Sequence, residues 1–312
     1  MSAEMVGVIS EIWRYPVKSM AGERLMAVDV QAGTMGLLGD RGWALRDDTA
    51  GEIRGAKNFP TLMLCSARYL EPPGIDHVPH VAITLPDGRS IRSDDPQVNR
   101  ILSEFLGHAV SLMPLQPASN KAHYRRAQPG SSLIGKIAHS RWRPWFEKLL
   151  PYTKLERDTR ELLSREAGEP SLDYSTIPAD LFEFTSPPGT YFDLWPLHLM
   201  TTASLAEMER VNPKAVWDVR RFRPNFLIST APEQSGLVEA EWGGRRLSLG
   251  SLQCQMSVPT IRCGMTAHAQ SELAKDPSVL RSIVREAGQN LGVYGSAAQS
   301  GRVRVDDTVV LH

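Results

Sequence analysis

A single cysteine beside an arginine is the part of this sequence best suited to chemistry. Cys263 lies in the run Val258-Pro259-Thr260-Ile261-Arg262-Cys263-Gly264. A thiolate is a strong ligand for a soft or high-valent metal, and the adjacent Arg262 favours the ionised sulfur over the thiol. Such a cysteine can hold a metal as its only protein ligand. The alternative is a small buried hydrophobic residue near the end of a strand.

The remaining cysteines and the charge balance restrict the class of protein. Cys65, Cys254 and Cys263 are the three cysteines among 312 residues, with no Cys-x-x-Cys spacing, so neither a disulfide framework nor a structural zinc site is encoded. The first residues show no secretion signal, and no window reaches the roughly 18 apolar residues of a membrane span. Thirty-five basic residues balance thirty-five acidic ones, which disfavours nucleic acid and membrane surfaces as partners. We therefore expect a soluble cytoplasmic protein.

Three short runs place cations beside turn residues, as a binding site for an anion requires. The runs are Tyr15-Pro16-Val17-Lys18-Ser19, Gly39-Asp40-Arg41-Gly42-Trp43 and Arg221-Phe222-Arg223-Pro224-Asn225. A guanidinium can bind phosphate in a bidentate manner, lysine acts as a point charge, and serine and asparagine can hydrogen-bond a polar heterocycle. Together with Arg262 and Cys263, these runs indicate a site for an anionic metal cofactor.

The elements that would position these runs are mainly strands in the first hundred residues. Apolar runs at 6–9, 25–28, 42–45 and 62–64 alternate with turn signals, which is typical of an antiparallel β unit. Residues 81–85 predict a hairpin that returns through Asp87-Gly88. A helix is expected next, with Asp95 as N-cap, Pro96 at its first position and Gly107 as its end. We expect this helix to close one end of a barrel.

The segment from about 115 to 190 has poor periodicity. Residues 121–143 contain six Lys or Arg and no acid, interleaved with Tyr124 and Trp142, so stacking on nucleic-acid bases is one interpretation. The mixed and acidic stretch 147–169 follows directly, which favours a self-paired surface insertion that serves as a lid or connection. Its basic half remains a candidate docking surface for an acidic partner protein.

A second β unit with helices begins near Tyr191. A helix is expected from Thr202 or Ser204, the latter forming a capping box with Glu207, and another from Pro277 to Leu291 with Asp276 as its cap. Strand patterns cover 226–228, 246–249, 252–256, 302–305 and 309–311. The predicted fold class is therefore mainly β with helices, in two β-barrel-like units with an irregular helical insertion between them.

In order, spacing and residue type, the cation runs and the Arg262-Cys263 pair resemble the MOSC family, the molybdenum-cofactor sulfurase C-terminal domain proteins. The similarity is to the branch with an N-terminal MOSC β-barrel, which includes the amidoxime-reducing components. It implies an N-terminal barrel domain at 5–110, an insertion at 111–190 and a MOSC domain at 191–312. It also implies that Cys263 ligates molybdenum or, in a sulfurase-like module, carries persulfide sulfur. The residues implied to bind the molybdenum cofactor, molybdopterin with its metal, are Lys18, Ser19, Arg41, Arg223, Asn225 and Arg262.

Two departures from the family pattern concern the pocket. The family has Asp-Thr-Ser-Pro where this chain has Asp193-Leu194-Trp195-Pro196, which removes two hydroxyls and adds an indole. The small polar residue before Arg-Cys is here Ile261. We expect the cofactor still to bind through backbone groups and the substrate pocket to differ.

The leading hypothesis is a molybdenum-cofactor oxidoreductase that reduces N-hydroxylated or N-oxide compounds by oxo transfer. Asp193 is either a proton donor or a structural cap. The chain has no ferredoxin-type cysteine cluster, so the electrons are expected from a separate electron-donor protein. The alternatives are a sulfur-carrier or cofactor-delivery module that uses a Cys263 persulfide, and a protein that binds the pterin without chemistry.

Overall fold

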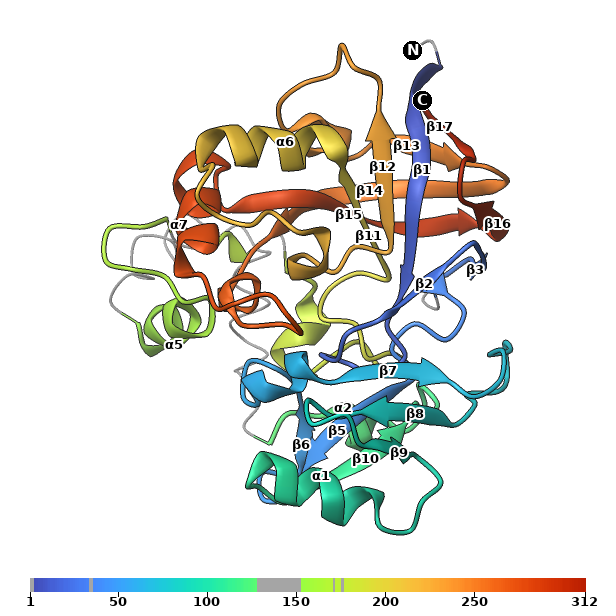
Figure 1. Cartoon of the computed structure of the whole chain (residues 1–312), viewed down its shortest axis with the longest axis vertical. Coiled ribbons are helices and arrows are strands. Elements are labelled where there is room, and N and C mark those ends of the chain that lie inside the picture. Colours follow the sequence, from blue (N-terminus) through green and yellow to red (C-terminus); the bar gives the residue numbers. More distant parts are fainter. Residues whose placement is uncertain (1–2, 34–35, 128–152, 171, 175–176) are drawn as a thin grey trace.

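A closed barrel of seven strands dominates the computed structural model, which describes residues 3–33, 36–127, 153–170, 172–174 and 177–312 (Figure 1). The strands follow the order β12-β11-β15-β14-β13-β17-β1, and pairing between β12 and β1 closes the barrel. Their bounds are β1 Glu4–Arg14, β11 Leu197–Thr201, β12 Phe226–Thr230, β13 Arg246–Leu249, β14 Leu252–Ile261, β15 Asn290–Gln299 and β17 Thr308–Leu311. The pairings are antiparallel except that between β11 and β12.

The first strand of the chain completes this C-terminal barrel. β1 pairs with β12 on one side and with β17 on the other, so the two chain ends lie side by side (Figure 1). Gly7 has a φ of 153°, and a Cβ there would lie 2.2 Å from the carbonyl oxygen of Ser229, so the β1–β12 contact requires glycine. The resemblance places the first residues in the N-terminal unit, whereas the hydrogen bonds of β1 place that strand in the C-terminal barrel. The boundaries at 5–110, 111–190 and 191–312 otherwise stay a prediction.

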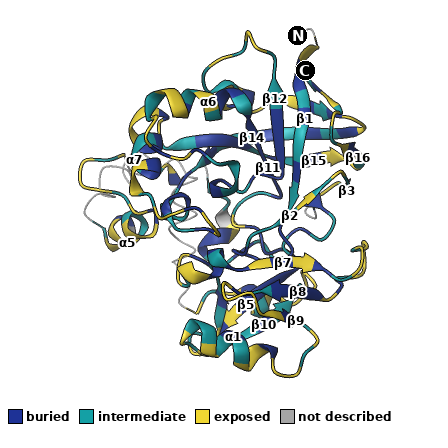
Figure 2. Cartoon of the chain, viewed as in Figure 1, coloured by how far each residue is buried: buried dark blue, intermediate teal, exposed yellow. Residues whose placement is uncertain are grey.

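Short strands extend the barrel beside β1. β2 (Glu23–Leu25) pairs with β1, while β16 (Gly301–Arg304), β3 (Ala27–Gln31) and β4 (Gly36–Leu37) form a separate three-stranded sheet. Apolar side chains from the barrel strands and from β3, β4 and β16 fill one core inside the barrel. Figure 2 shows the barrel strands mainly in the colours of buried and intermediate residues, whereas β2 and β16 carry exposed residues.

The N-terminal unit contains two three-stranded sheets and one long helix. The first sheet has β10 (Val110–Pro114), β5 (Trp43–Asp47) and β6 (Glu52–Arg54), and the second has β7 (Ser66–Tyr69), β8 (Val81–Thr84) and β9 (Ser90–Arg92). Single parallel bridges, Val17 with Trp43 and Ala21 with Ser66, connect them to the segment after β1. α1 (Val98–Leu106) buries Val98 and Leu102 in the shared core.

Helices cover the barrel on its outer side. α6 (Thr202–Val211) and α7 (Pro277–Glu286) enclose an apolar core with β12, and α7 contacts η7 (Gly264–Ala267). The remaining short helices are η1 Pro60–Leu64, α2 Lys121–Tyr124, α5 Lys154–Leu162, η4 Ala179–Phe182, η5 Val219–Arg221 and η6 Val238–Trp242. Among the described residues, no helix has both the length and the apolar character needed to cross a membrane.

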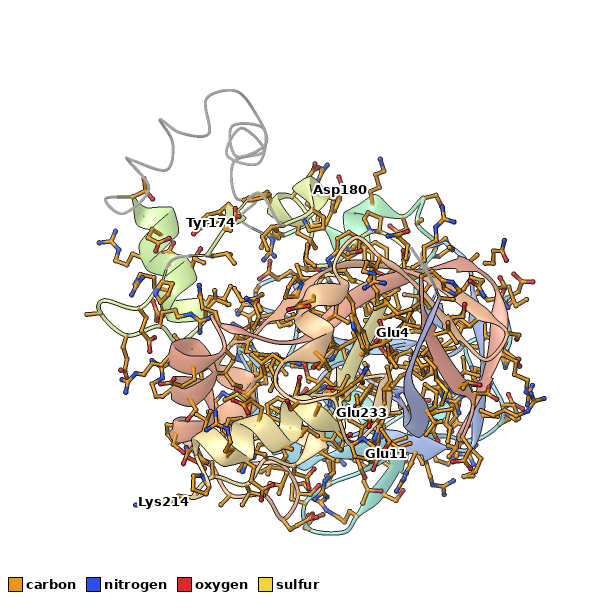
Figure 3. All side chains as sticks on the ribbon, turned by 90° about the horizontal axis from the view of Figure 1, so that it is seen from above. Glu4, Glu11, Tyr174, Asp180, Lys214 and Glu233 are labelled. Carbon is orange, nitrogen blue, oxygen red and sulfur yellow. The ribbon has the colours of Figure 1, made fainter. Side chains whose placement is uncertain are left out.

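The described part of the middle segment pairs partly within itself and partly with the C-terminal unit, where Arg281 forms an ion pair with Glu169 at 2.7 Å. Arg125 forms an ion pair with Glu183 at 2.7 Å, and the side chain of Arg126 donates to the carbonyl of Leu181 at 3.1 Å. Seen from above, this segment, marked by Tyr174 and Asp180, lies along one edge of the molecule, away from Glu4 and Glu11 (Figure 3). Trp142 and the basic residues Lys136, Arg141 and Arg143 lie outside the described residues, so the docking surface for an acidic partner protein stays a prediction.

The predicted fold class is confirmed, and several local predictions differ from the structure. Residues 62–64 lie in the 3-10 helix η1, which begins with Pro60, rather than in a strand. α6 begins at Thr202, which is the first of the two predicted starts, and only the alternative capping box at Ser204 is wrong: Thr201 caps the helix by accepting from the amide of Ser204. α7 has the predicted Asp276 cap but ends at Glu286, because Gly288 and Gln289 adopt positive φ angles. The 81–88 hairpin and the end of α1 at Gly107 are confirmed. The start of α1 differs from the prediction: the helix begins at Val98 with Gln97 as its N-cap, not at Pro96 with Asp95 as the cap.

Candidate functional site

One cavity brings together six of the eight residues singled out in the sequence: Arg41, Asp193, Arg223, Asn225, Arg262 and Cys263. It lies where the end of β14 and η7 meet the turn before β12 and the segment before β11. The other residues that line it are Leu194, Trp195, His198, Arg221, Phe222, Ile261, Met265, Thr266 and Tyr294. Four arginines and one thiol therefore face one small space.

Cys263 is the one cysteine that reaches this cavity. It follows the end of β14 and is the N-cap of η7, and its carbonyl accepts from the amide and the hydroxyl of Thr266 within that helix. Cys65 and Cys254 are buried in the two barrel cores, and burial raises the pKa of each thiol to about 12. Only the half-buried Cys263 is thus placed to act as a ligand or a sulfur carrier.

Arg262 supports the end of β14 through hydrogen bonds within the protein. It donates from Nε to the carbonyl of Leu291 at 2.7 Å and from Nη1 to that of Phe222 at 3.1 Å. Its Nη2 donates to Nε2 of His198 at 2.7 Å. Burial lowers the pKa of Arg262 to about 10. These bonds hold Arg262 as a positioning residue beside Cys263, and its predicted contact with a cofactor stays a prediction.

His198 links Arg262 to the Arg223-Pro224-Asn225 run. Because Nε2 of His198 accepts from Arg262, the proton lies on Nδ1, which points at the carbonyl of Arg223 at 3.3 Å. Burial, and then the charge of Arg262, hold the pKa of His198 well below its ordinary value. The imidazole is therefore neutral, and it transmits the position of the β14 end to the turn before β12.

Asp40 connects three segments of the site by hydrogen bonds. This buried carboxylate accepts from the amide of Tyr15 at 2.8 Å, from the guanidinium of Arg41, and from Nδ2 of Asn225 at 3.0 Å. The Oδ1 atom of Asn225 accepts in turn from the amide of His198 at 3.1 Å. The side chain of Asn225 is fully buried and engaged at both ends, so the structure gives it a bracing role.

Arg41 and Arg223 stack on the same aromatic ring. Their guanidinium carbons lie 5.3 and 4.2 Å from the centre of the Tyr15 ring. Both residues have positive φ angles, 53° and 55°, which non-glycine residues rarely adopt. Nη1 of Arg223 donates to the carbonyl of Met20 at 2.6 Å. Nη2 of Arg223 is buried and, among the described residues, has no hydrogen-bond partner. A ligand with an anionic oxygen would supply one.

Lys18 reaches the cavity through Asp193. Its ammonium donates to the carboxylate of Asp193 at 2.7 Å and to the carbonyl of Tyr191 at 2.7 Å. The carboxylate of Asp193 is about half exposed, and the nearby charges of Lys18, Lys57 and Arg41 hold its pKa below the ordinary value. Asp193 is thus ionised at neutral pH. The hydroxyl of Ser19 accepts from the amide of Ala56 at 2.8 Å and lies outside the cavity lining, so its predicted cofactor contact stays a prediction.

The departure at Trp195 has a visible consequence. The indole lines the cavity, and its buried Nε1 has no hydrogen-bond partner among the described residues. Two residues that line this cavity, Trp195 and Arg223, therefore each carry a buried donor that has no hydrogen-bond partner among the described residues. An unsatisfied buried donor costs about 1–3 kcal/mol, which a ligand oxygen would offset.

Sequence reasoning missed Asp40, His198 and Tyr294 as parts of the site. Asp40 lies inside a run chosen for its neighbour Arg41, and a buried acid next to a cation was the available signal. His198 and Tyr294 lie on strands β11 and β15, where nothing in the local sequence distinguishes them from residues packed on a barrel.

The middle segment forms an outer wall against the same strand end. Nη2 of Arg165 donates to the carbonyl of Arg262 at 2.7 Å, and Nε donates to Gln289 at 3.1 Å. A Cβ at Gly264 would lie 2.3 Å from the hydroxyl oxygen of Ser164, so this glycine permits the close approach of the segment. The insertion thus fixes the backbone on which Cys263 is mounted.

The site is suited to an anionic group that brings its own metal. Among the described residues, no group of three or more His, Cys, Asp or Glu is arranged to hold a metal ion directly. The cavity instead combines a half-buried thiol with Arg41, Arg221, Arg223 and Arg262. Thiolate prefers soft metals and guanidinium prefers phosphate, so the cavity offers one ligand for the metal and others for the phosphate of a phosphorylated metal cofactor.

Comparison with known families agrees with this architecture. Residues 191–310 match the MOSC domain, and residues 6–108 match the MOSC N-terminal beta barrel domain. Together the two matches span most of the chain, which belongs to the family of MOSC-domain proteins with an N-terminal MOSC β-barrel.

Within that family the chain is similar to the protein named mitochondrial amidoxime reducing component 2. It is 25% identical to the Bos taurus protein over 98% of this chain and 83% of the relative. It is 24% identical to the Homo sapiens protein over 98% of this chain and 84% of the relative. The crystal structure of the YUAD protein from Bacillus subtilis aligns with 100% of this chain and 97% of that chain, at 9% identity and a TM-score of 0.41. The cytoplasmic location stays a prediction.

Proposed function

We propose that this chain is a molybdenum-cofactor oxidoreductase that reduces N-hydroxylated or N-oxide compounds with electrons from a separate donor protein. The observation that carries the proposal is the position of Cys263, half-buried in a cavity lined by Arg223, whose buried Nη2 has no acceptor within the described part of the chain. The similarity to amidoxime reducing components supports the reaction class.

The residues present fit the cofactor. Arg41 and Arg223, stacked on Tyr15, present guanidinium groups to a phosphate, and the free donors of Arg223 and Trp195 can bind polar groups of the pterin. The thiol of Cys263 would be the protein ligand of molybdenum. When bound, the cofactor supplies two-electron oxo-transfer chemistry.

The other residues hold these groups in place. Asp40 fixes Arg41 and Asn225, while Arg262 and His198 fix the end of β14. The lowered pKa of Asp193 makes it a poor proton donor at neutral pH, which favours a carboxylate that orients Lys18 over the general-acid alternative. The three cysteines have no iron–sulfur spacing, which supports the proposal that a separate protein donates the electrons.

The test is the molybdenum content and activity of cysteine variants. The purified protein should contain extractable molybdenum cofactor and oxidise a reduced dye with an amidoxime, an N-oxide or an S-oxide as acceptor. Cys263→Ala should abolish this activity, whereas Cys65→Ala, which removes a thiol from the core, should retain it. Full activity in Cys263→Ala would refute the assignment.

The alternative is a sulfur carrier or cofactor-delivery module, because a half-buried thiol at a cavity also suits a persulfide. Failure to reduce any of these acceptors, together with isolation of a Cys263 persulfide that passes its sulfur to an acceptor, would replace the reductase proposal with this one.

A further inference from the structure

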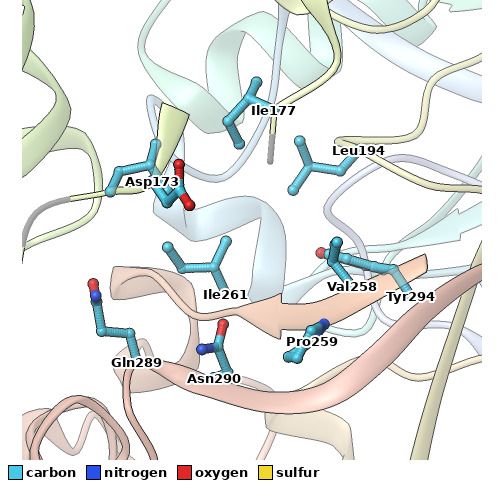
Figure 4. Close-up of a pocket in the computed structure, with 10 residues that line it drawn as sticks. Asp173, Ile177, Leu194, Val258, Pro259, Ile261, Gln289, Asn290 and Tyr294 are labelled. Atoms are coloured by element: carbon cyan, nitrogen blue, oxygen red, sulfur yellow. The ribbon is translucent and has the colours of Figure 1, made fainter. Parts of the chain in front are cut away.

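The hydroxyl of Tyr294 is a polar group of the Cys263 cavity to which the proposed function gives no role. Tyr294 lies on β15, and its ring is 5.5 Å from the ring of His198 on the neighbouring strand β11. It lines the Cys263 cavity and also a second cavity of ≈ 260 Å³ between β14, β15 and the middle segment. Figure 4 shows its side chain reaching into this space with the hydroxyl oxygen at the tip. Tyr294 therefore stands at the junction of the two cavities, which also share Leu194 and Ile261.

This hydroxyl is not used for structure. Within the described part of the chain, the oxygen of Tyr294 has no hydrogen-bond partner. Each of the other five described tyrosines donates its hydroxyl to a protein acceptor. These donors and acceptors are Tyr15 and the carbonyl of Pro224, Tyr69 and that of Gly39, Tyr124 and that of Gln116, Tyr191 and that of Pro114, and Tyr174 and the carboxylate of Glu156. A hydroxyl that lines a cavity without a protein partner is available to a ligand.

The hydroxyl is also the cavity group best able to give up a proton. Burial raises the pKa of Tyr294 to about 12, so it is protonated at neutral pH. Asp193 is already ionised, and both ring nitrogens of His198 are engaged. The hydroxyl of Thr266 donates to the carbonyl of Cys263 at 3.1 Å. Guanidinium and indole groups keep their protons, so they can bind an oxygen without transferring a proton to it.

We propose that the hydroxyl of Tyr294 binds the oxygen of the substrate N–O bond and gives it a proton as that bond breaks. The inference rests on the function proposed above. Reduction of an amidoxime takes two electrons from the donor protein, which is oxidised, and two protons from the surroundings. The N–O bond breaks, one O–H and one N–H bond form, and the products are an amidine and water.

Tyr294 supplies the proton of the new O–H bond, and solvent supplies that of the N–H bond. The phenolate left on Tyr294 then regains its proton from solvent. The charges of Arg262 and Arg41 act to lower the pKa of Tyr294, so they stabilise that phenolate. A phenol suits this step because the oxygen becomes strongly basic only as the N–O bond breaks.

Binding of pyridine N-oxide to the oxidised, molybdenum-loaded protein tests the contact without turnover, because that state holds no electrons for the reduction. Tyr294→Phe removes the hydroxyl and keeps the ring. We expect the N-oxide to bind about five- to ten-fold more weakly to the variant, which is the loss of one hydrogen bond. Calorimetric titration measures both affinities.

The same variant should lose turnover and keep its stability. We expect kcat for benzamidoxime to fall about 100-fold with a smaller change in KM, because general acid catalysis contributes about 10²–10⁴-fold. Molybdenum content and the midpoint of thermal unfolding should stay at their wild-type values, because the hydroxyl makes no hydrogen bond within the described residues.

The matched control is Tyr124→Phe, which removes a hydroxyl outside both cavities that donates to the carbonyl of Gln116. It should lower the midpoint of thermal unfolding by about 2 °C and leave N-oxide binding and kcat unchanged.

An unchanged affinity or an unchanged kcat in folded Tyr294→Phe would overturn the inference and leave the reductase function intact. A fall in thermal midpoint as large as that of Tyr124→Phe would also overturn it, because the hydroxyl of Tyr294 would then have a structural partner. If the wild-type protein reduces no N-oxygenated compound but Tyr294→Phe weakens N-oxide binding, the contact stands and the reductase proposal fails, together with the proton transfer.

Discussion

Replacing Arg223 tests whether its free guanidinium nitrogen holds the cofactor. Arg223→Ala removes the Nη2 donor that has no partner within the described residues, the Nη1 bond to the carbonyl of Met20, and the stacking on Tyr15. A hydrogen bond to a charged group contributes about 1.5–3 kcal/mol, so loss of the phosphate contact should weaken cofactor retention roughly 10- to 150-fold.

The same change should destabilise the protein even without cofactor. The carbonyl of the buried Met20 loses its donor, which costs about 1–3 kcal/mol, and the cation–π contact contributes about 0.5–2 kcal/mol. Retention must therefore be separated from folding. Urea unfolding of cofactor-free protein gives the stability, and fluorescence of extracted pterin after extensive dialysis gives the retention.

Arg221→Ala is the matched control. Arg221 also lines the cavity, but its guanidinium donates to the carbonyls of Val216, Thr266, His268 and Ala274, so all its nitrogens are engaged within the protein and none is left for a ligand. We expect Arg221→Ala to destabilise the protein at least as much as Arg223→Ala, with a much smaller loss of cofactor. Wild-type cofactor retention in Arg223→Ala, or an equal loss of cofactor in both variants, would refute the proposed contact between Arg223 and the cofactor phosphate, because retention would then follow stability alone.

Two further predictions concern residues behind the site. His198 is neutral in the folded protein because its pKa lies well below the ordinary 6.5, so below pH 6.5 the unfolded chain binds more protons than the folded one. The contribution of His198 to the free energy of unfolding is therefore complete above pH 6.5 and should decline by up to about 1.4 kcal/mol per pH unit below it. Urea titrations at pH 7.5 and 5.5 measure this decline, and His198→Gln should remove it. Arg165→Ala should release the carbonyl of Arg262 and speed alkylation of Cys263 several-fold in the cofactor-free protein, whereas Arg125→Ala, which removes an exposed ion pair with Glu183, should not; equal alkylation rates in all three proteins would contradict the role of Arg165.

The sequence was most informative where chemistry and turn geometry coincide. Cys263, Arg41 and Arg223 could be singled out because a thiol or a cation beside Gly or Pro is unusual, and the cavity contains all three. The positive φ angles of Arg41 and Arg223 could not be predicted from the sequence, because glycine is the residue that usually indicates this conformation.

Long-range partners account for what the sequence could not provide. Asp40 and Asn225 are 185 residues apart, and Lys18 and Asp193 are 175 apart, so no local pattern connects them. The predicted strand at 62–64 failed for a related reason: an apolar triplet suits either a strand or a buried helical turn, and Pro60 decides for the turn. Closure of the barrel by β1 likewise depends on a pairing between chain ends.

The position of the site explains why its parts come from both ends of the chain. Tyr15 and Lys18 follow directly after β1, which completes the C-terminal barrel, while Asp40 and Arg41 directly precede β5 of the N-terminal unit. Asp40 then joins Tyr15 to Asn225 at the start of β12. The cationic cavity therefore forms only when the two units are docked. A cofactor that binds there stabilises that docked arrangement, because it binds the assembled state and not the separated one.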